Sequence, residues 1–280
     1  MLQRVAVGRS FLAAAIVAPA LALGGQSTET TGILAIGDFG VGGERQETMG
    51  AAVRTWEETH PAQVLVTLGD NDYTESPSAF HDNWTASFGW LGAAGVGVAG
   101  TLGNHDIRVD GGRYQFDELD MPRRHYRRIV GNVELFLLNS NAPGSTTQRE
   151  WLRNSLRAST ATWQIVAFHH PAYTCGNYLG HPTILSRWVP LFERRGVDLV
   201  LSGHDHNYQR FAQHRGVHYV VHGGGGQELY PIRSCPGSYP TRRVALSRRG
   251  FLYLVAGAGQ LRGYAVTPGG GILDSFAIRP

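Results

Sequence analysis

Residues 33–38 read ILAIGD, four apolar residues followed by a glycine and an aspartate. Similar apolar runs end in a polar side chain at three further places, QVLVTLGD (63–70), WQIVAFH (163–169) and VDLVLSGH (197–204). Near-continuous apolar runs of this length are typical of strands that are buried on both faces of a mostly parallel sheet. Because the carboxyl ends of parallel strands lie at one edge of the sheet, the pattern predicts an α/β fold with its polar groups gathered at that edge.

The other elements follow from hydrophobic periodicity. We expect strands at residues 33–37, 63–68, 96–102, 133–139, 163–168, 197–202 and 218–222. Helical patterns occupy residues 44–59, 78–90, 146–158 and 183–195, and Thr147 with Glu150 can form a capping box in the third of them. After residue 250, apolar stretches separated by Gly and Pro predict an antiparallel meander. This order of elements predicts β-α-β units and a β tail in one domain of stacked layers.

The first 22 residues have the three-part pattern of a secretory signal. Arg4 and Arg9 precede an apolar stretch at 11–23, and the small residues at 20–22 offer a cleavage point. This stretch is shorter than the roughly 20 residues that span a bilayer, although an uncleaved anchor remains an alternative. We therefore expect a signal peptide at 1–22, a linker at 23–31 and one domain at 32–280. The protein would be secreted or periplasmic, with no membrane contact after the signal is removed.

Composition narrows the function classes. The chain has 280 residues, of which 42% are hydrophobic and 17% charged, so a sizeable core is expected. Its formal net charge is +3 and its basic residues, all arginines, are scattered, so nucleic-acid binding is not expected. Two cysteines, Cys175 and Cys235, form an even count that favours a disulfide in an oxidising compartment, with two free buried thiols as the alternative.

Polar side chains with metal-binding chemistry recur where the predicted strands end. These candidate ligands are Asp38, Asp70, Tyr73, Asn104, His169, His204 and His206. Taken singly, each has an ordinary explanation as a turn residue, a packed aromatic or a hydrogen-bonded core histidine. Together, their carboxylate, amide, phenol and imidazole donors suit Fe, Zn or Mn. Asp70 lies in the middle of the set and is the natural bridge between two ions, and His105, beside Asn104, is placed to donate a proton.

At these residues the chain resembles the calcineurin-like metallophosphoesterases, and within them the purple acid phosphatase branch of tartrate-resistant type. That branch carries five blocks: an Asp block, GDxxY, GNH[DE], VxxH and GHxH. They stand here as Gly37-Asp38-Phe39-Gly40, Gly69-Asp70-Asn71-Asp72-Tyr73, Gly103-Asn104-His105-Asp106, Val166-Ala167-Phe168-His169 and Gly203-His204-Asp205-His206. Generic metallophosphoesterases usually carry a His where this chain has Gly40, and they lack the metal-binding Tyr73.

The resemblance implies a four-layer α/β/β/α sandwich of two mixed sheets flanked by helices. It also implies two metal ions. Asp38, Asp70, Tyr73 and His206 would hold the first ion, and Asp70, Asn104, His169 and His204 the second. Fe(III) is expected at the Tyr73 position, with Fe, Zn or Mn beside it.

The resemblance further implies an acid phosphatase that hydrolyses phosphate monoesters by attack of a metal-bound hydroxide. His105 would be the catalytic acid, and His170 and His181 would face the substrate. The substrate would be a phosphorylated small molecule or a phosphoprotein. Two alternatives stay open: a phosphodiesterase or nucleotidase on the same fold, and a non-catalytic exported protein that binds metal or phosphate.

Overall fold

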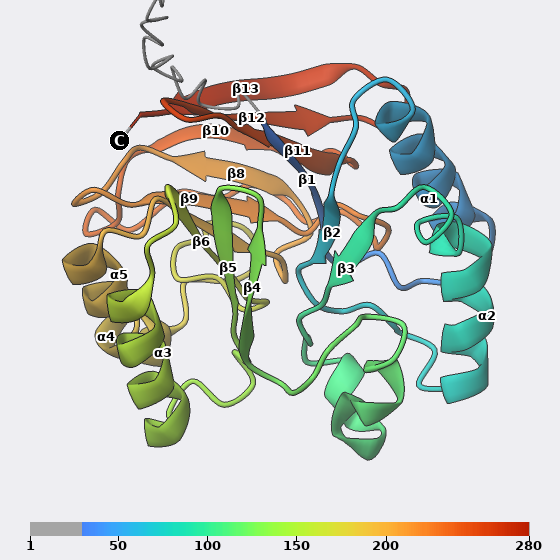
Figure 1. The fold of residues 1–280 in the computed structure, drawn as a ribbon, viewed down its shortest axis with the longest axis horizontal. Coiled ribbons are helices and arrows are strands. Elements are labelled where there is room, and N and C mark those ends of the chain that lie inside the picture. Colours follow the sequence, from blue (N-terminus) through green and yellow to red (C-terminus); the bar gives the residue numbers. More distant parts are fainter. Residues whose placement is uncertain (1–29, 280) are drawn as a thin grey trace, which may run out of the picture.

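A computed structural model describes residues 30–279, in which two mixed β-sheets lie face to face (Figure 1). The first sheet contains, in spatial order, β13 (Ile272–Ile278), β12 (Leu261–Val266), β11 (Phe251–Ala256), β1 (Thr31–Ile36), β2 (Val64–Thr67) and β3 (Gly97–Ala99). The second contains β10 (Arg242–Leu246), β8 (Tyr208–Phe211), β9 (His218–His222), β7 (Leu199–Ser202), β6 (Trp163–Ala167), β5 (Val133–Leu137) and β4 (Tyr126–Val130).

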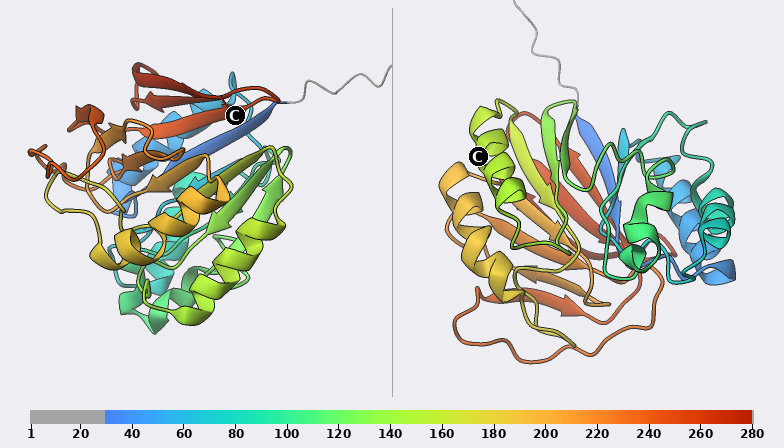
Figure 2. Two further views of the ribbon diagram at one scale, coloured as in Figure 1. Left: turned by 90° about the vertical axis from the view of Figure 1, so that its left-hand side faces the viewer. Right: turned by 90° about the horizontal axis from the view of Figure 1, so that it is seen from below.

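Helices cover the outer faces of both sheets (Figure 2). The first sheet is flanked by α1 (Gly43–Glu57) and α2 (Pro77–Phe88). The second is flanked by α3 (Thr146–Ala158), α4 (Pro182–Arg187) and α5 (Val189–Arg195). Short 3-10 turns, η1 (Asp106–Arg108) and η2 (Asp110–Gln115), follow β3. The predicted four-layer α/β/β/α sandwich is confirmed.

The apolar runs of the sequence form the inner strands. All seven predicted strands are present, and β11, β12 and β13 form the predicted antiparallel meander, which pairs with β1. Sequence periodicity did not reveal β4, β8 and β10. These strands carry arginine pairs or a Gln-Arg pair in place of an apolar run, and β4 and β10 lie at the edges of their sheet, where one side is open to water.

Two helix predictions were wrong in detail. The single helix expected at 183–195 is broken at Trp188 into α4 and α5. Pro190 lies in the first turn of α5, where its missing N–H is tolerated, but it cannot sit in the middle of a continuous helix. The cap of α3 is Ser145 and not Thr147, because the helix begins earlier and the Ser145 hydroxyl accepts from the Gln148 N–H at 3.2 Å.

Each sheet has a parallel part, and a hydrogen-bonded contact joins the two sheets. β1, β2 and β3 run parallel in the first sheet, as do β5, β6, β7 and β9 in the second. The sheets are tied to each other by Asp274 of β13, which accepts from the Tyr208 hydroxyl at 2.7 Å and from the Arg210 guanidinium at 2.6 and 3.0 Å, both on β8. These hydrogen bonds hold β13 of the first sheet against β8 of the second.

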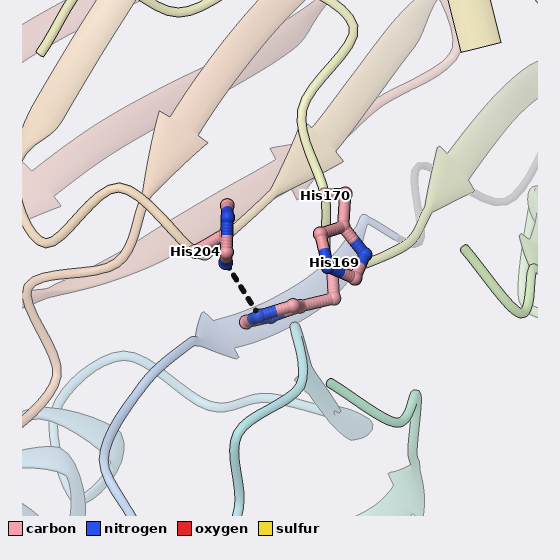
Figure 3. Close-up of side chains that lie close together, drawn as sticks. All are labelled: His169, His170 and His204. Atoms are coloured by element: carbon pink, nitrogen blue, oxygen red, sulfur yellow. Dashed lines mark hydrogen bonds between the residues drawn. The ribbon is translucent and has the colours of Figure 1, made fainter. Parts of the chain in front are cut away.

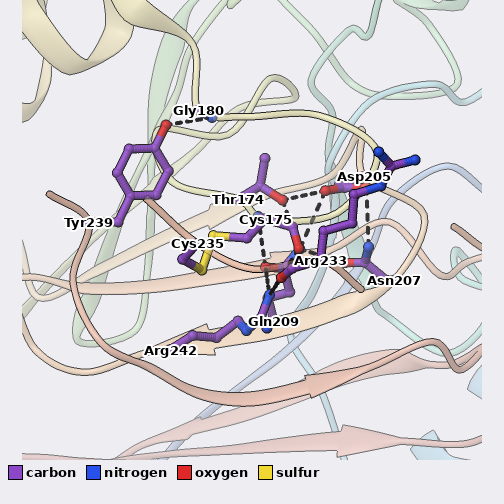
Figure 4. The surroundings of a disulfide bond; sticks show 10 residues. All are labelled: Thr174, Cys175, Gly180, Asp205, Asn207, Gln209, Arg233, Cys235, Tyr239 and Arg242. Atoms are coloured by element: carbon purple, nitrogen blue, oxygen red, sulfur yellow. Dashed lines mark hydrogen bonds between the residues drawn. A yellow bond between two sulfur atoms is a disulfide. The ribbon is translucent and has the colours of Figure 1, made fainter. Parts of the chain in front are cut away.

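A disulfide joins Cys175 to Cys235, which lies 60 residues further along the chain (Figure 4). The alternative of two free thiols is therefore excluded. The bond links the segment after β6 to the segment before β10, and it suits an oxidising compartment. None of the helices within residues 30–279 is long and apolar enough to cross a bilayer. The expected signal peptide at 1–22 lies outside the described residues.

Candidate metal centre

Three candidate ligands sit in a backbone conformation that side chains rarely adopt. The φ angles of Asp38, Asp70 and His204 are +59°, +51° and +69°. Each residue follows a glycine within two residues of the end of β1, β2 or β7, where the chain turns sharply. Backbone strain of this kind costs about 1–3 kcal/mol per residue and persists where the surrounding structure enforces it.

Glycines allow the loops to approach one another. A Cβ atom at Gly103 would lie 2.1 Å from Asp70 Oδ1, and one at Gly203 would lie 2.5 Å from Asp38 Oδ2. Neither position has room for a side chain while the carboxylates keep their place. Glycine before the polar residue is therefore a packing requirement of the site.

One group of donor atoms contains Asp38, Tyr73 and His206. The Tyr73 hydroxyl lies 3.3 Å from Asp38 Oδ1 and 3.3 Å from His206 Nε2. His206 Nε2 is also 3.3 Å from Asp38 Oδ1, so the three atoms form a nearly equilateral triangle. Asp38 follows β1 of the first sheet and His206 lies between β7 and β8 of the second, so this group takes side chains from the loops of both sheets.

The other group is centred on His169, which is fully buried. His169 Nε2 lies 3.1 Å from Asn104 Oδ1, 3.4 Å from Asp70 Oδ2 and 3.2 Å from His204 Nδ1. Figure 3 shows His169 and His204 pointing at each other, with His170 on the neighbouring turn. This group also takes donors from both sheets.

The two groups adjoin. Donor atoms of Asp38, Asp70 and His169 all lie within 4.8 Å of one another, which places Asp70 between the group of Tyr73 and the group of His204. The other Asp70 oxygen, Oδ1, accepts from the His105 backbone N–H at 2.9 Å. The structure thus brings together all seven of the candidate ligands.

Hydrogen bonds on the far side of two imidazoles fix which nitrogen faces the site. His169 Nδ1 lies 2.9 Å from the Leu68 carbonyl oxygen and His206 Nδ1 lies 2.8 Å from that of Glu228. A carbonyl can only accept, so Nδ1 carries the proton and Nε2 presents a lone pair in the neutral ring. Lone pairs of nitrogen, carboxylate and amide oxygen therefore converge with few protons between them. This donor set fits bound cations.

In the bare site, burial and the two carboxylates shift the pKa values of the candidate ligands in different directions. Burial, reinforced by Asp38 and Asp70, raises the pKa of Tyr73 far above its usual range. Burial and the neighbouring His169 lower the pKa of His204 to about 2. Burial opposes charge on His169 as well, but Asp70 and Asp38 outweigh it and raise the pKa of His169 to about 9. A phenolate at Tyr73 thus requires a cation beside it.

His105 lies at the rim of the site and outside both groups. Its ring packs against that of Tyr73 with centroids 4.4 Å apart, and burial lowers its pKa. The Arg108 guanidinium lies 3.5 Å from His105 Nε2. The ring is part-exposed and adjoins the ligands without joining them, an arrangement that leaves it available for proton transfer.

His170 and His181 line a small pocket beside the two groups of donor atoms. His170 Nδ1 lies 2.9 Å from the Ser140 hydroxyl, and the His170 ring lies 4.5 Å from that of His204. His181 is the N-cap of α4, and its ring lies 6.0 Å from that of His170. The two predicted substrate-side histidines are therefore neighbours, and both line a pocket of about 200 Å³.

Asp106, to which we assigned no role from the sequence, holds two of the ligand loops together. It is fully buried, and its Oδ1 accepts from the backbone N–H of Asn71 at 2.8 Å and of Asp72 at 3.0 Å. Its Oδ2 accepts from the Gly103 N–H at 2.7 Å. Asp106 therefore fixes the residues that flank Asp70 and Asn104. Its position as the last residue of the GNH[DE] block is the feature of the sequence that could have indicated this role.

Comparison with known proteins agrees with this geometry. A family model described as Calcineurin-like phosphoesterase matches residues 31–208, which hold all five sequence blocks. The chain belongs to this family. Its members are hydrolases of phosphoric esters that depend on two metal ions, and the two adjoining donor groups fit such a pair.

Relatives in the calcineurin-like phosphoesterase family include purple acid phosphatases. The chain is 25% identical to purple acid phosphatase 7 of Arabidopsis thaliana, over 72% of each chain. It is 24% identical to tartrate-resistant acid phosphatase type 5 of Mus musculus, over 74% of this chain and 76% of the relative.

The fold also matches that of a yellow lupin purple acid phosphatase, with a TM-score of 0.78 at 18% identity. The match covers 90% of this chain and 54% of the lupin chain, so this chain spans about half the length of that protein. At this level of identity the match concerns the fold, while the family follows from the sequence.

Proposed function

We propose that this protein is an exported acid phosphatase of the purple type, which hydrolyses phosphate monoesters at a dinuclear metal centre carried by one domain at 32–280. The observation that carries the proposal is the convergence of seven donor side chains from both sheets into two adjoining groups. The names of the Arabidopsis and mouse relatives support the choice of branch, and the disulfide supports export.

In this proposal the first metal is held by Asp38, Asp70, Tyr73 and His206, and the second by Asp70, Asn104, His169 and His204. A phenolate favours a hard trivalent ion, so we assign Fe(III) to the position of Tyr73 and Fe, Zn or Mn to the other. Asp70 would contact both ions, because its donor atom lies within 4.8 Å of those of Asp38 and His169.

The chemistry that the metals supply when bound is Lewis acidity toward the phosphoryl oxygens and toward water. The protein side chains do the rest. His170 and His181 line the pocket beside the ligands and bind the ester. His105, at the rim of the site, gives a proton to the leaving oxygen, which otherwise departs as an unstable anion.

Metal analysis and substrate comparison test this proposal. Purified protein should hold two metals per chain, at least one of them iron, and should show a visible phenolate-to-iron absorption band that Tyr73→Phe removes. It should turn over phosphomonoesters faster than diesters, with the advantage greatest at acid pH. Faster turnover of diesters would assign the site to a phosphodiesterase, and bound metal without any turnover would make the protein a metal-binding relative.

Replacing His105 by Ala should slow turnover while both metals stay bound. General acid catalysis contributes about 10²–10⁴-fold, so a loss of this size is expected for an alkyl phosphate. The loss should be smaller for an aryl phosphate, because a phenol ionises near pH 10 and its anion leaves without help. The measurement is kcat for both esters together with metal content. Equal losses for the two esters would show that His105 is not the proton donor.

A further inference from the structure

Two exposed apolar side chains stand at the mouth of the site. Tyr178 and Leu179 are 39% and 61% exposed, and Ile129 and Ile272 are the only other exposed large apolar residues of the described chain. We call this pair the lip. It lines the same pocket of about 200 Å³ as His170, His181 and His204. Exposed apolar residues beside a catalytic centre are candidates for contact with a substrate.

The lip is held rigidly. Cys175 is bonded to Cys235 (Figure 4). Cys175 also pairs with Leu179 in a β-bridge, which closes the loop that carries the lip. The Asn177 N–H donates to Asp205 Oδ1 at 3.0 Å, and Asp205 lies between the ligands His204 and His206. A surface fixed before the substrate arrives loses little conformational entropy on binding.

The aromatic rings of this region stack on the metal ligands. The Tyr178 ring lies on that of His204, with centroids 4.2 Å apart and planes 24° apart. The Tyr230 ring lies on that of His206 at 4.0 Å and 15°, and it meets Tyr178 edge-on at 5.9 Å. The rings of Tyr178 and Tyr230 thus form one aromatic surface, which lies on the two histidines and includes the tyrosine of the lip.

The lining of the pocket indicates which leaving group fits. It contains a tyrosine, a leucine, two prolines and three histidines, and no Arg, Asp or Glu. Such a lining offers no fixed charge to a second phosphate group. An engineered apolar cavity of about 150 Å³ holds benzene, so a pocket of about 200 Å³ holds one aromatic ring.

From this arrangement we infer that the Tyr178–Leu179 lip is a specificity-determining surface, and that the preferred substrates are aryl phosphate monoesters whose ring packs against it. The inference rests on the proposed phosphatase function. Hydrolysis would break the bond between phosphorus and the aryl oxygen and form a bond from phosphorus to the oxygen of water. A phenol and inorganic phosphate are the products, with one proton of the water passing to the phenol.

The ratio of kcat/KM for phenyl phosphate to kcat/KM for ethyl phosphate tests the inference. Tyr178→Ala should lower this ratio about tenfold, because it removes both area and a ring-to-ring contact. Leu179→Ala, which leaves the rings on the ligands in place, should lower it about threefold. Tyr178→Phe keeps the ring and should keep the ratio. Ile129→Ala, at an exposed apolar residue of β4, is the matched control and should also keep it.

A binding measurement separates the inference from the proposed function. Phenylphosphonate has no hydrolysable ester bond, and calorimetry should show that it binds more tightly than methylphosphonate to the wild type, with that preference reduced in Tyr178→Ala and Leu179→Ala. If the wild type hydrolyses neither ester, the proposed function fails. If it hydrolyses both and neither alanine variant changes the ratio or the preference, the proposed function stands and the role of the lip is refuted.

Discussion

Asp70→Asn is expected to abolish turnover, with kcat at least about 10³-fold lower, and to reduce the metal content below two ions per chain. The amide keeps the shape of the side chain and an oxygen that accepts from the His105 N–H, now 2.9 Å from Oδ1. It loses the negative charge and the second oxygen that faces His169 Nε2 at 3.4 Å. Asparagine also tolerates a positive φ, so the variant should fold.

The readouts for Asp70→Asn are metal stoichiometry by mass spectrometry, kcat for a phosphomonoester and the unfolding temperature. Asp72→Asn is a matched control, because Asp72 is equally buried but turns its carboxylate to Thr74 and Tyr114. This control should retain both metals. Full activity with two bound metals in Asp70→Asn would rule out Asp70 as the bridge, and with it the proposed centre.

Asp106→Asn should cause the largest loss of stability of any conservative substitution near the site. The amide nitrogen would replace Oδ2 and bring a donor against the Gly103 N–H, which lies 2.7 Å from that oxygen, and the Asn71 Nδ2 group, at 3.1 Å. The Gly103 N–H would then be buried without its acceptor, whereas Asn71 Nδ2 would keep the Thr101 carbonyl and Gln115 Oε1. Leaving one buried donor unsatisfied costs about 1–3 kcal/mol, so we expect the free energy of unfolding to fall by about this amount.

Turnover should fall as well in Asp106→Asn, by about 10–100-fold, because the loops that carry Asp70 and Asn104 lose their common support. Urea unfolding and kcat are the measurements. Asp117→Asn removes one charge from an exposed position nearby and should leave both unchanged. An Asp106→Asn protein as stable and active as the wild type would mean that the buried hydrogen bonds of Asp106 contribute nothing net.

Much of the fold was readable because its central strands are buried on both faces. The runs ILAI and VLVT are typical of buried strands, and they form β1 and β2. The strands that escaped prediction, such as β8 and β10, are held by their neighbours and by contacts like that of Arg210 with Asp274. In both strands a Gln-Arg or Arg-Arg pair interrupts or replaces the apolar pattern, so the local sequence does not indicate a strand.

The candidate site divides in the same way. The candidate ligands follow the ends of predicted strands, so the sequence alone could propose them, and the structure brings those residues together. The support of Asp106 and the stacking of Tyr178 on His204 depend on how separate loops approach each other. No spacing along the chain encodes that approach, so these contacts required coordinates.

The left-handed backbone at Asp38, Asp70 and His204 has a consequence for the history of such chains. Glycine would relax the backbone at each position, but it would remove the donor atom and, at Asp38 and Asp70, the carboxylate that accepts from the His204 or His105 N–H. Selection for turnover alone keeps the original residues. In relatives that have lost the hydrolytic activity, we expect glycine to appear at these three positions before the residues of the core change.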